Sequence, residues 1–225
     1  MQVQKTLFWK GWESEPEKSK HIKTGYVKDT LQENCRENPM KCIILPDKFD
    51  YDGSQISSLW AYNSFGVQED SVVVFRGACD VKIEHMIDLE DRRANESIFS
   101  EDMVSFIIEH FDSTALKLIY ARQRLFTALV GEYLTGIGVQ TTREGDDLFL
   151  RGKKLTVSIA STSAVSQKIH FGINVSHEIY GNMKEAGIGE DKQVASFMQA
   201  IGGAYVREFE DIEKDLRKSR QLGVV

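Results

Sequence analysis

The stretch that decides the fold reads TTREGDDLFLRGKKLTVSIAS and runs from Thr141 to Ser161. A short apolar run at 148–150 leads into the turn residues Arg151-Gly152, and a second run of small and β-branched residues follows. Short runs of this kind, bounded by glycine and charged residues, are typical of paired β-strands. We therefore predict a hairpin of two strands. Apolar residues alternate with others in these strands, as expected when one face is buried, and they are Phe149, Leu155, Val157 and Ile159.

Further strands are predicted on both sides of this hairpin. Residues 168–176 should form a third strand next to it, and residues 40–46 and 71–77 are apolar runs too short for a helix. Residues 101–111 fit a helix and a strand equally well, because their apolar side chains match both periods. The sequence therefore predicts a sheet of several strands, with one element of undecided type.

Helical spacing of apolar side chains marks residues 56–66 and 118–134. Residues 191–222 predict one or two helices, which should be interrupted or bent at Gly202-Gly203. The charged segment 85–96 predicts a loop. This order of elements indicates an α+β fold, with a mostly antiparallel sheet flanked by helices.

Composition and charge exclude several classes of function. The 225 residues are 41% hydrophobic and 28% charged, and the net charge of −6 argues against binding to nucleic-acid phosphates. No apolar run approaches the ~20 residues of a membrane span, so we expect no membrane partner and a cytoplasmic location. The three cysteines form no CxxC pair, which argues against both a disulfide framework and a zinc site.

The chain divides into two regions by composition. Residues 1–39 are rich in Lys, Glu, Ser and Asn and show no sustained apolar period, so we predict a polar N-terminal extension. Residues 40–225 carry all the predicted strands and the longer helices. They are numerous enough to bury one sizeable core, and we expect them to form one domain.

Three motifs occur in a recognisable order along this domain. Residues 72–81, VVVFRGACDV, place an Arg-Gly pair after a central strand. Residues 146–160, DDLFLRGKKLTVSIA, join an acidic pair, a Gly-Lys-Lys turn and a strand of small residues, and residues 169–175, IHFGINV, contain a His-x-Gly strand. With these motifs, the region from about Gly53 to Val175 resembles the lipoate and biotin protein ligase-like superfamily, and most of all an uncharacterised branch of it.

The resemblance implies a class II synthetase-like fold and a set of site residues. Lys154 occupies the position of the essential lysine, which would hold the acid's carboxylate against the α-phosphate. Asp147, with Asp146 beside it, would hold Mg²⁺. The remaining ligand-binding residues that the resemblance implies are Arg76, Gly77, Ser158, His170 and Gly172.

The function implied by the resemblance is the activation of a small carboxylic acid. An acid like lipoate, octanoate or biotin would be converted to an adenylate with ATP and Mg²⁺, and its acyl group would pass to a lysine of a carrier-protein domain. Strand alternation sends neighbouring side chains to opposite faces, so only one of Lys153 and Lys154 should face the pocket.

Simpler interpretations of the same residues stay open at this point. The lysines and the acidic pair could be a charged turn, and Arg76 could pair with a carboxylate of the acidic loop that follows it. His170 could be a buried histidine whose ring is satisfied by a backbone carbonyl. Ser158 could be a small strand residue that packs against a helix.

Departures from the family pattern favour a non-catalytic alternative, and a further alternative depends on Cys79. Ala78, Cys79 and Asp80 stand where the family has a glycine-rich loop, and Val157 stands where it has a glycine after the lysine. One alternative is a non-catalytic protein that keeps the ligase-like fold and binds a ligand or a partner. The other is an ATP-independent acyltransferase with Cys79 as its acyl acceptor.

Overall fold

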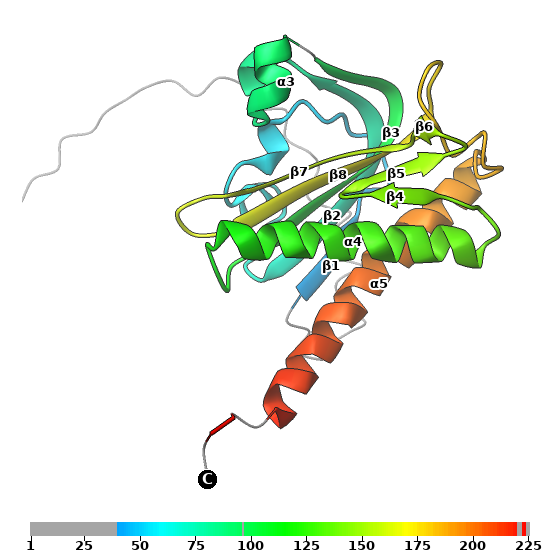
Figure 1. Cartoon of the computed structure of the whole chain (residues 1–225). Helices are drawn as coiled ribbons and strands as arrows, with labels where there is room; N and C mark the ends of the chain where they lie inside the picture. The colour runs from blue at the N-terminus through cyan, green and yellow to red at the C-terminus, as the bar shows by residue number, and fades with distance from the viewer. Residues whose placement is uncertain (1–39, 96, 220–221, 224–225) are drawn as a thin grey trace, which may run out of the picture. The chain divides into compact units, whose positions relative to one another are not determined.

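The computed structural model describes residues 40–95, 97–219 and 222–223, and the polar extension expected at residues 1–39 lies outside them. Its largest element is a five-stranded sheet with the strand order β1-β2-β3-β8-β7 (Figure 1). β1 pairs with β2 in parallel, and all other neighbours are antiparallel, which confirms the mostly antiparallel sheet. The strands of this sheet are β1 Met40–Ile44, β2 Asp70–Val81, β3 Ile98–His110, β7 Thr156–Thr162 and β8 Gln167–Ser176.

The segment of undecided type, residues 101–111, belongs to strand β3. It lies between β2 and β8, and its residues pair in register with both, as Phe106 does with Val74 and Phe171. Apolar layers cover both faces of the strand from Met103 to His110, and every side chain over these residues is buried. Burial on both faces removes the alternation that would have identified a strand in the sequence.

Two long helices, α4 Leu116–Gly136 and α5 Asp191–Lys218, pack against one face of the sheet (Figure 1). Aromatic rings join the layers, since Phe126 of α4 lies 5.1 Å from Phe106 and 5.0 Å from Phe171 between ring centroids, both edge-on. Edge-on ring pairs contribute roughly 0.5–1.5 kcal/mol each beyond their buried area. The helix predicted at residues 118–134 is confirmed.

Helix α5 is not interrupted at Gly202-Gly203, because it is one continuous helix of 28 residues, so the alternative of two helices is wrong. Gly202 serves close packing instead. A Cβ atom at this position would come within 2.7 Å of Cys42 Sγ and 3.3 Å of Val74 Cγ2. The missing side chain therefore lets the helix approach β1 and β2, at some cost in helix propensity.

The opposite face of the sheet is covered by shorter elements, η1 Ser54–Ile56 and α2 Trp60–Phe65. The helix predicted over 56–66 is therefore present only as the six residues of α2. The segment predicted as a loop at 85–96 contains the end of η2 Ile83–His85 and a short helix, α3 Leu89–Ala94. Asp88 caps this helix, because its Oδ1 accepts hydrogen bonds from the backbone N–H groups of Glu90 and Asp91.

A second, three-stranded sheet contains β4 Thr142–Glu144, β5 Asp147–Leu150 and β6 Lys153–Lys154. The predicted hairpin is therefore divided, since β5 pairs with β4 and β6 while β7 pairs with β8 in the large sheet. Within β5, Leu148 and Leu150 enter the core and Phe149 is only half-buried. The β5–β6 turn has positive φ at Arg151 and Gly152, which is characteristic of a tight hairpin.

No helix among the described residues is long and apolar enough to span a membrane.

Candidate functional site

Two adjoining cavities form a cleft beside strand β7. The smaller cavity, of about 210 Å³, is lined by four aspartates together with apolar residues, and we call it the acidic compartment. The larger, of about 370 Å³, is lined by apolar and aromatic side chains beside a similar number of polar ones, and we call it the apolar compartment. The aspartates are Asp88, Asp91, Asp146 and Asp147, and the apolar compartment's large side chains are Ile98, Phe99, Met103, Val157 and Tyr180.

Lys154 lines both compartments and so lies where they meet. Its Nζ is 2.9 Å from Asp147 Oδ2, and the two side chains are 42% and 24% exposed. The strand register explains the pair, because Lys154 lies opposite Phe149 and Asp147 is on the same face of β5 as Phe149. Lys153 points elsewhere, pairs with Glu185 at 3.1 Å and lines neither compartment, as strand alternation predicts.

The two adjacent aspartates are held differently. Asp146 forms an ion pair with Arg124 and accepts a 2.8 Å hydrogen bond from Gln123 Nε2, so helix α4 anchors it. Asp147 forms an ion pair with Lys154 of the neighbouring strand. Carboxylate oxygens are the ligands that Mg²⁺ prefers, and the lining of the acidic compartment therefore fits a magnesium ion that Asp147 would hold.

Among the described residues, the side chains that lie close enough together to share one metal ion are Asp70, His110 and Asp112, and they do not line the cleft. Asp70 Oδ2 lies 2.7 Å from His110 Nδ1, and Arg122 binds both carboxylate oxygens of Asp112 at 2.6 and 2.7 Å. These ligand atoms are already engaged, and a guanidinium beside them would repel a cation. The group is therefore a structural network.

Ser158 and His170 belong to the wall of the acidic compartment. Ser158 Oγ donates to the His170 carbonyl at 3.0 Å and accepts from Gln123 Nε2 at 2.9 Å. The His170 ring stacks on Tyr51 with centroids 3.6 Å apart, and its Nε2 is 3.2 Å from Ser105 Oγ. Burial lowers the pKa of His170 to about 3, so its imidazole is neutral in the folded protein.

Arg76 does not line the cleft. Its guanidinium binds both oxygens of Asp102 at 2.7 Å and also Asp191 at 2.9 Å, which ties β2, β3 and the start of α5 together. An acidic partner for this arginine was one interpretation of the sequence, but the partners come from β3 and α5 and not from the loop after β2. The hydrogen bonds to Asp102 raise the pKa of Arg76 above its ordinary value.

The two glycines of the predicted site also have packing roles outside the cleft lining. A Cβ atom on Gly77 would come within 2.2 Å of the Phe49 carbonyl oxygen, because residues 49–51 pair with β2 at this point. A Cβ atom on Gly172 would come within 2.3 Å of Met103 Sδ. We therefore do not include Gly77, Gly172 or Arg76 in the proposed site.

Cys79 is buried, and burial raises the pKa of its thiol to about 12, with the charge of Asp80 contributing. The thiolate is the nucleophilic form of cysteine, and this thiol stays protonated. The acyl-accepting role considered for Cys79 therefore has no support from its surroundings.

Sequence reasoning did not assign Tyr51 or the aspartates of segment 88–91 to the cleft, and it did not identify Gln123 as the residue that holds two cleft side chains. Gln123 carried a signal, because it is a polar residue on the buried stripe of α4 between Ile119 and Phe126. A buried amide in such a position needs hydrogen-bond partners, and here it finds Asp146 and Ser158. Tyr51 gave no comparable signal, since it lies in a segment without periodicity.

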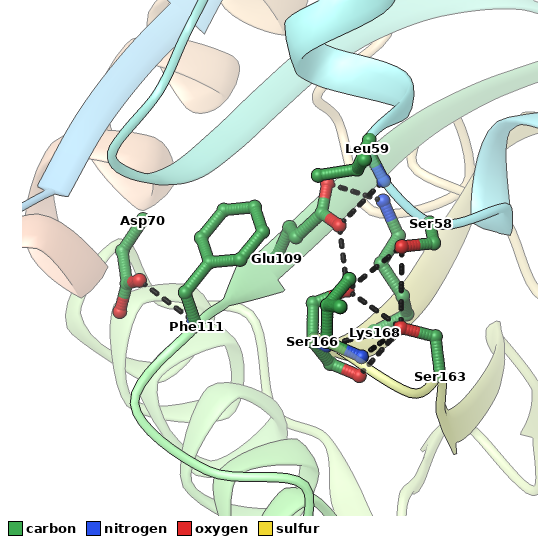
Figure 2. A network of polar contacts seen from close by, with 9 residues as sticks. Ser58, Leu59, Asp70, Glu109, Phe111, Ser163, Ser166 and Lys168 are labelled. Atoms are coloured by element: carbon green, nitrogen blue, oxygen red, sulfur yellow. Dashed lines mark hydrogen bonds and ion pairs between the residues drawn. The ribbon is translucent and has the colours of Figure 1, made fainter.

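A second lysine–carboxylate pair lies in the core. Lys168 Nζ donates to Glu109 Oε2 at 3.0 Å, and the side chains are 2% and 1% exposed. Figure 2 shows that Glu109 Oε1 is engaged as well, by the backbone N–H of Leu59 at 2.8 Å and Ser166 Oγ at 2.7 Å. Burial lowers the pKa of Lys168, and the charge of Glu109 opposes this shift.

The family described as "Domain of unknown function (DUF366)" matches residues 40–220. An uncharacterized protein of Methanocaldococcus jannaschii is 42% identical over 190 residues, which cover 81% of this chain and 86% of that protein. The solved structure of a protein of unknown function from Pyrococcus horikoshi is 40% identical with a TM-score of 0.76, and the match covers 81% of this chain and 99% of that one.

The structure of a putative lipoate protein ligase from T. acidophilum with bound lipoic acid is similar at a TM-score of 0.51 and 12% identity, covering 76% of this chain and 95% of that one. At this identity the likeness shows the fold alone. It confirms the expected α+β fold of the lipoate and biotin protein ligases. The chain therefore belongs to the DUF366 family, an uncharacterised branch of proteins with the lipoate and biotin protein ligase fold.

Proposed function

We propose that this protein activates a small carboxylic acid as an adenylate, with ATP and Mg²⁺, and transfers the acyl group to a lysine of a carrier-protein domain. One observation carries the proposal. Lys154 lies at the meeting point of an apolar and an acidic compartment, next to Asp147. An acid with an apolar tail requires a cation for its carboxylate and, next to it, apolar surface for its tail.

The apolar compartment would take the tail of the acid. Its wall contains Phe99, Met103 and Tyr180, and burying apolar surface there would contribute roughly 25 cal/mol per Å². The carboxylate would then reach Lys154. Because Lys154 and Asp147 are both partly exposed to water, the ammonium can exchange Asp147 for the incoming carboxylate with little loss.

The acidic compartment would take the phosphates of the nucleotide together with the metal. Four aspartates line it, so a polyphosphate alone would be repelled, and a magnesium ion would remove the repulsion. A magnesium ion held there would supply positive charge to offset the charge of the phosphates. Asp147, once released by Lys154, is the carboxylate that would hold the ion, while Asp146 stays anchored by Arg124.

Ser158 and His170 would shape the wall of this compartment. The neutral ring of His170 is fixed by Tyr51 and Ser105, so it would offer a rigid surface and would not act as a base near neutral pH. Ser158 is fixed by Gln123 and the His170 carbonyl. Both side chains are therefore preorganised before a ligand binds.

The proposal is tested by acid-dependent exchange of pyrophosphate into ATP, with lipoate, octanoate and biotin each supplied as the acid. Lys154→Ala should lower the exchange rate by about 10²–10³-fold, as the loss of one transition-state donor does. Lys153→Ala is the matched control, because that lysine lies next in the chain but pairs outside the cleft, and its rate should be unchanged. Full exchange activity in Lys154→Ala would overturn the proposal.

A second candidate function is binding of the acid, or of a partner, without catalysis. It is favoured by Arg76, whose guanidinium is bound by Asp102 and Asp191 and does not line the cleft where a phosphate would lie. Thermal shifts with acid and ATP, alone and together, distinguish the two functions. Mutual enhancement of the shifts supports the ligase, and a shift with the acid that ATP does not increase supports the binding protein.

A further inference from the structure

Gln123 of helix α4 connects two side chains of the acidic compartment without lining the cleft itself. Its side chain is 1% exposed, and its Nε2 donates one hydrogen bond to Asp146 Oδ2 at 2.8 Å and another to Ser158 Oγ at 2.9 Å. Asp146 directly precedes strand β5 of the small sheet, and Ser158 belongs to strand β7 of the large sheet. One amide group therefore joins the two sheets at the acidic compartment.

The orientation of this amide indicates what it contributes. A carboxylate such as that of Asp146 only accepts hydrogen bonds, so the nitrogen of the amide and not its oxygen must face it. Gln123 Oε1 is buried as a result, and it has no hydrogen-bond partner among the residues that the structure describes. A buried acceptor without a donor is unfavourable for folding. The amide therefore adds less to stability than its burial suggests, and it supplies the placement of Asp146 and Ser158.

A second buried glutamine, Gln167, has the opposite arrangement. It is 0% exposed, its Nε2 donates to the Ala115 carbonyl at 2.8 Å, and its Oε1 accepts a hydrogen bond from Arg122. Both ends of this amide are satisfied, and Gln167 lines neither compartment. Gln167 therefore supports the junction of β8 and α4, and it provides a reference for a glutamine with a purely structural role.

We propose that Gln123 is a positioning residue for the metal ion of the acidic compartment. This inference rests on the proposed function, in which Asp147 would hold that ion. Asp147 follows Asp146 in the chain and begins β5, so the amide that fixes Asp146 against Ser158 also fixes the point from which the Asp147 carboxylate extends. Residues that orient metal ligands from outside the coordination sphere typically change metal affinity by roughly 10–100-fold.

The test measures the affinity of the protein for Mn²⁺ without nucleotide, by electron paramagnetic resonance, because Mn²⁺ takes the same oxygen ligands as Mg²⁺. Asp147→Asn identifies the site, since the ion of the acidic compartment should be lost in this variant. Gln123→Met removes both donors with little change in volume, and it should weaken Mn²⁺ binding at this site by about tenfold or more. Gln167→Met is the matched control, and its Mn²⁺ affinity should equal that of the unmodified protein.

Thermal melting of the same variants separates positioning from support of the fold. Gln167→Met should lower the melting temperature more than Gln123→Met does, because Gln123→Met also removes an unpaired acceptor from the interior. If Gln123→Met does not fold, Gln123→Asn takes its place, since its amide is one methylene too short to reach both Asp146 and Ser158. The expected loss of Mn²⁺ affinity is the same.

The outcomes separate this inference from the proposed function. If Mn²⁺ is lost in Asp147→Asn but binds Gln123→Met as tightly as the unmodified protein, the inference is overturned and the proposed metal site stands. If Gln123→Met and Gln167→Met weaken binding equally, the inference is also overturned, because the effect is then a general one on the fold. If Mn²⁺ does not bind the unmodified protein, or binds Asp147→Asn equally well, the proposed metal site fails and the inference fails with it.

Discussion

Two lysine–carboxylate pairs of this protein have nearly the same length and opposite surroundings. Lys168 and Glu109 are 3.0 Å apart and almost completely buried, and the glutamate's second oxygen is saturated by Leu59 and Ser166 (Figure 2). Lys154 and Asp147 are 2.9 Å apart at a cleft junction and partly exposed. Ion-pair distance alone therefore says nothing about function.

The two pairs differ in the free-energy cost of separating the lysine from its carboxylate. Breaking the buried pair leaves a charge without water or a partner, which is strongly unfavourable, so this pair fixes the fold. Breaking the exposed pair exchanges one partner for solvent or for a ligand at little cost. A lysine that binds substrate needs the second property, and Lys154 has it.

The largest predicted effect is on the buried pair. Glu109→Ala should lower the free energy of unfolding by about 3–5 kcal/mol, because it leaves Lys168 charged and unpaired in the core. Urea denaturation measures the change. The double variant Glu109→Leu with Lys168→Met should recover part of the loss, since it removes both charges, although Leu59 and Ser166 still lose their acceptor. A loss below about 1 kcal/mol in Glu109→Ala would contradict the structural role of the pair.

The next effect is a dependence of stability on pH, carried by His170. Its folded pKa of about 3 lies below the ordinary value of 6.5, so the unfolded chain binds a proton more readily than the folded one. Stability is therefore complete above pH 6.5 and falls as pH decreases from about 6.5 to about 3, by up to roughly 1.4 kcal/mol per pH unit.

Denaturation of the unmodified protein and of His170→Gln across this pH range isolates the contribution. The variant should show a shallower decline, while burial of His110, whose pKa is also lowered, leaves a residual slope in both proteins. Equal slopes in the two proteins would show that His170 is not buried as a neutral ring.

A smaller effect distinguishes structural from ligand-binding roles for Arg76. Asp102→Asn should destabilise the fold by roughly 1–3 kcal/mol, because it weakens two hydrogen bonds to a largely buried guanidinium. Asp191→Asn is the control, and its side chain is 94% exposed, so the expected change is within about 0.5 kcal/mol. Acid affinity should be unchanged in both, and a loss of affinity in Asp102→Asn would return Arg76 to the binding site.

The smallest effect on stability is expected for Lys154, the residue at the centre of the proposed chemistry. Lys154→Ala should change the free energy of unfolding by less than about 1 kcal/mol, because its ion pair is partly exposed and screened by water. Thermal and urea denaturation measure this directly. A loss comparable to that of Glu109→Ala would mean that Lys154 supports the fold, and the contrast between the two pairs would disappear.

The sequence was sufficient for the fold class and for the separation of Lys153 from Lys154, because both follow from local periodicity. It was not sufficient to predict that the hairpin is divided between two sheets. That division depends on the tertiary packing of Leu148, Leu150 and Leu155 in the core. It also misjudged Gly202, since a glycine that allows a helix to approach a strand and a glycine that breaks a helix look identical in a sequence.

Within the site, most of the predicted residues that line the cleft are close to one another in the chain, and His170 is the exception. Asp146, Asp147, Lys154 and Ser158 lie within one short stretch and all line the cleft. Arg76 was expected there, but its partner Asp102 comes from a neighbouring strand whose register no local pattern reveals. Tyr51 is brought onto His170 by tertiary packing alone.

The central claim is that the cleft around Lys154 joins a carboxylic acid to a nucleotide. Native mass spectrometry of the protein after incubation with ATP, Mg²⁺ and either lipoate, octanoate or biotin tests it directly. The account predicts a bound species with the mass of the corresponding acyl-adenylate, which is absent from Lys154→Ala and present in Lys153→Ala. Bound acid or nucleotide in unmodified form only, with each of the three acids, would contradict it.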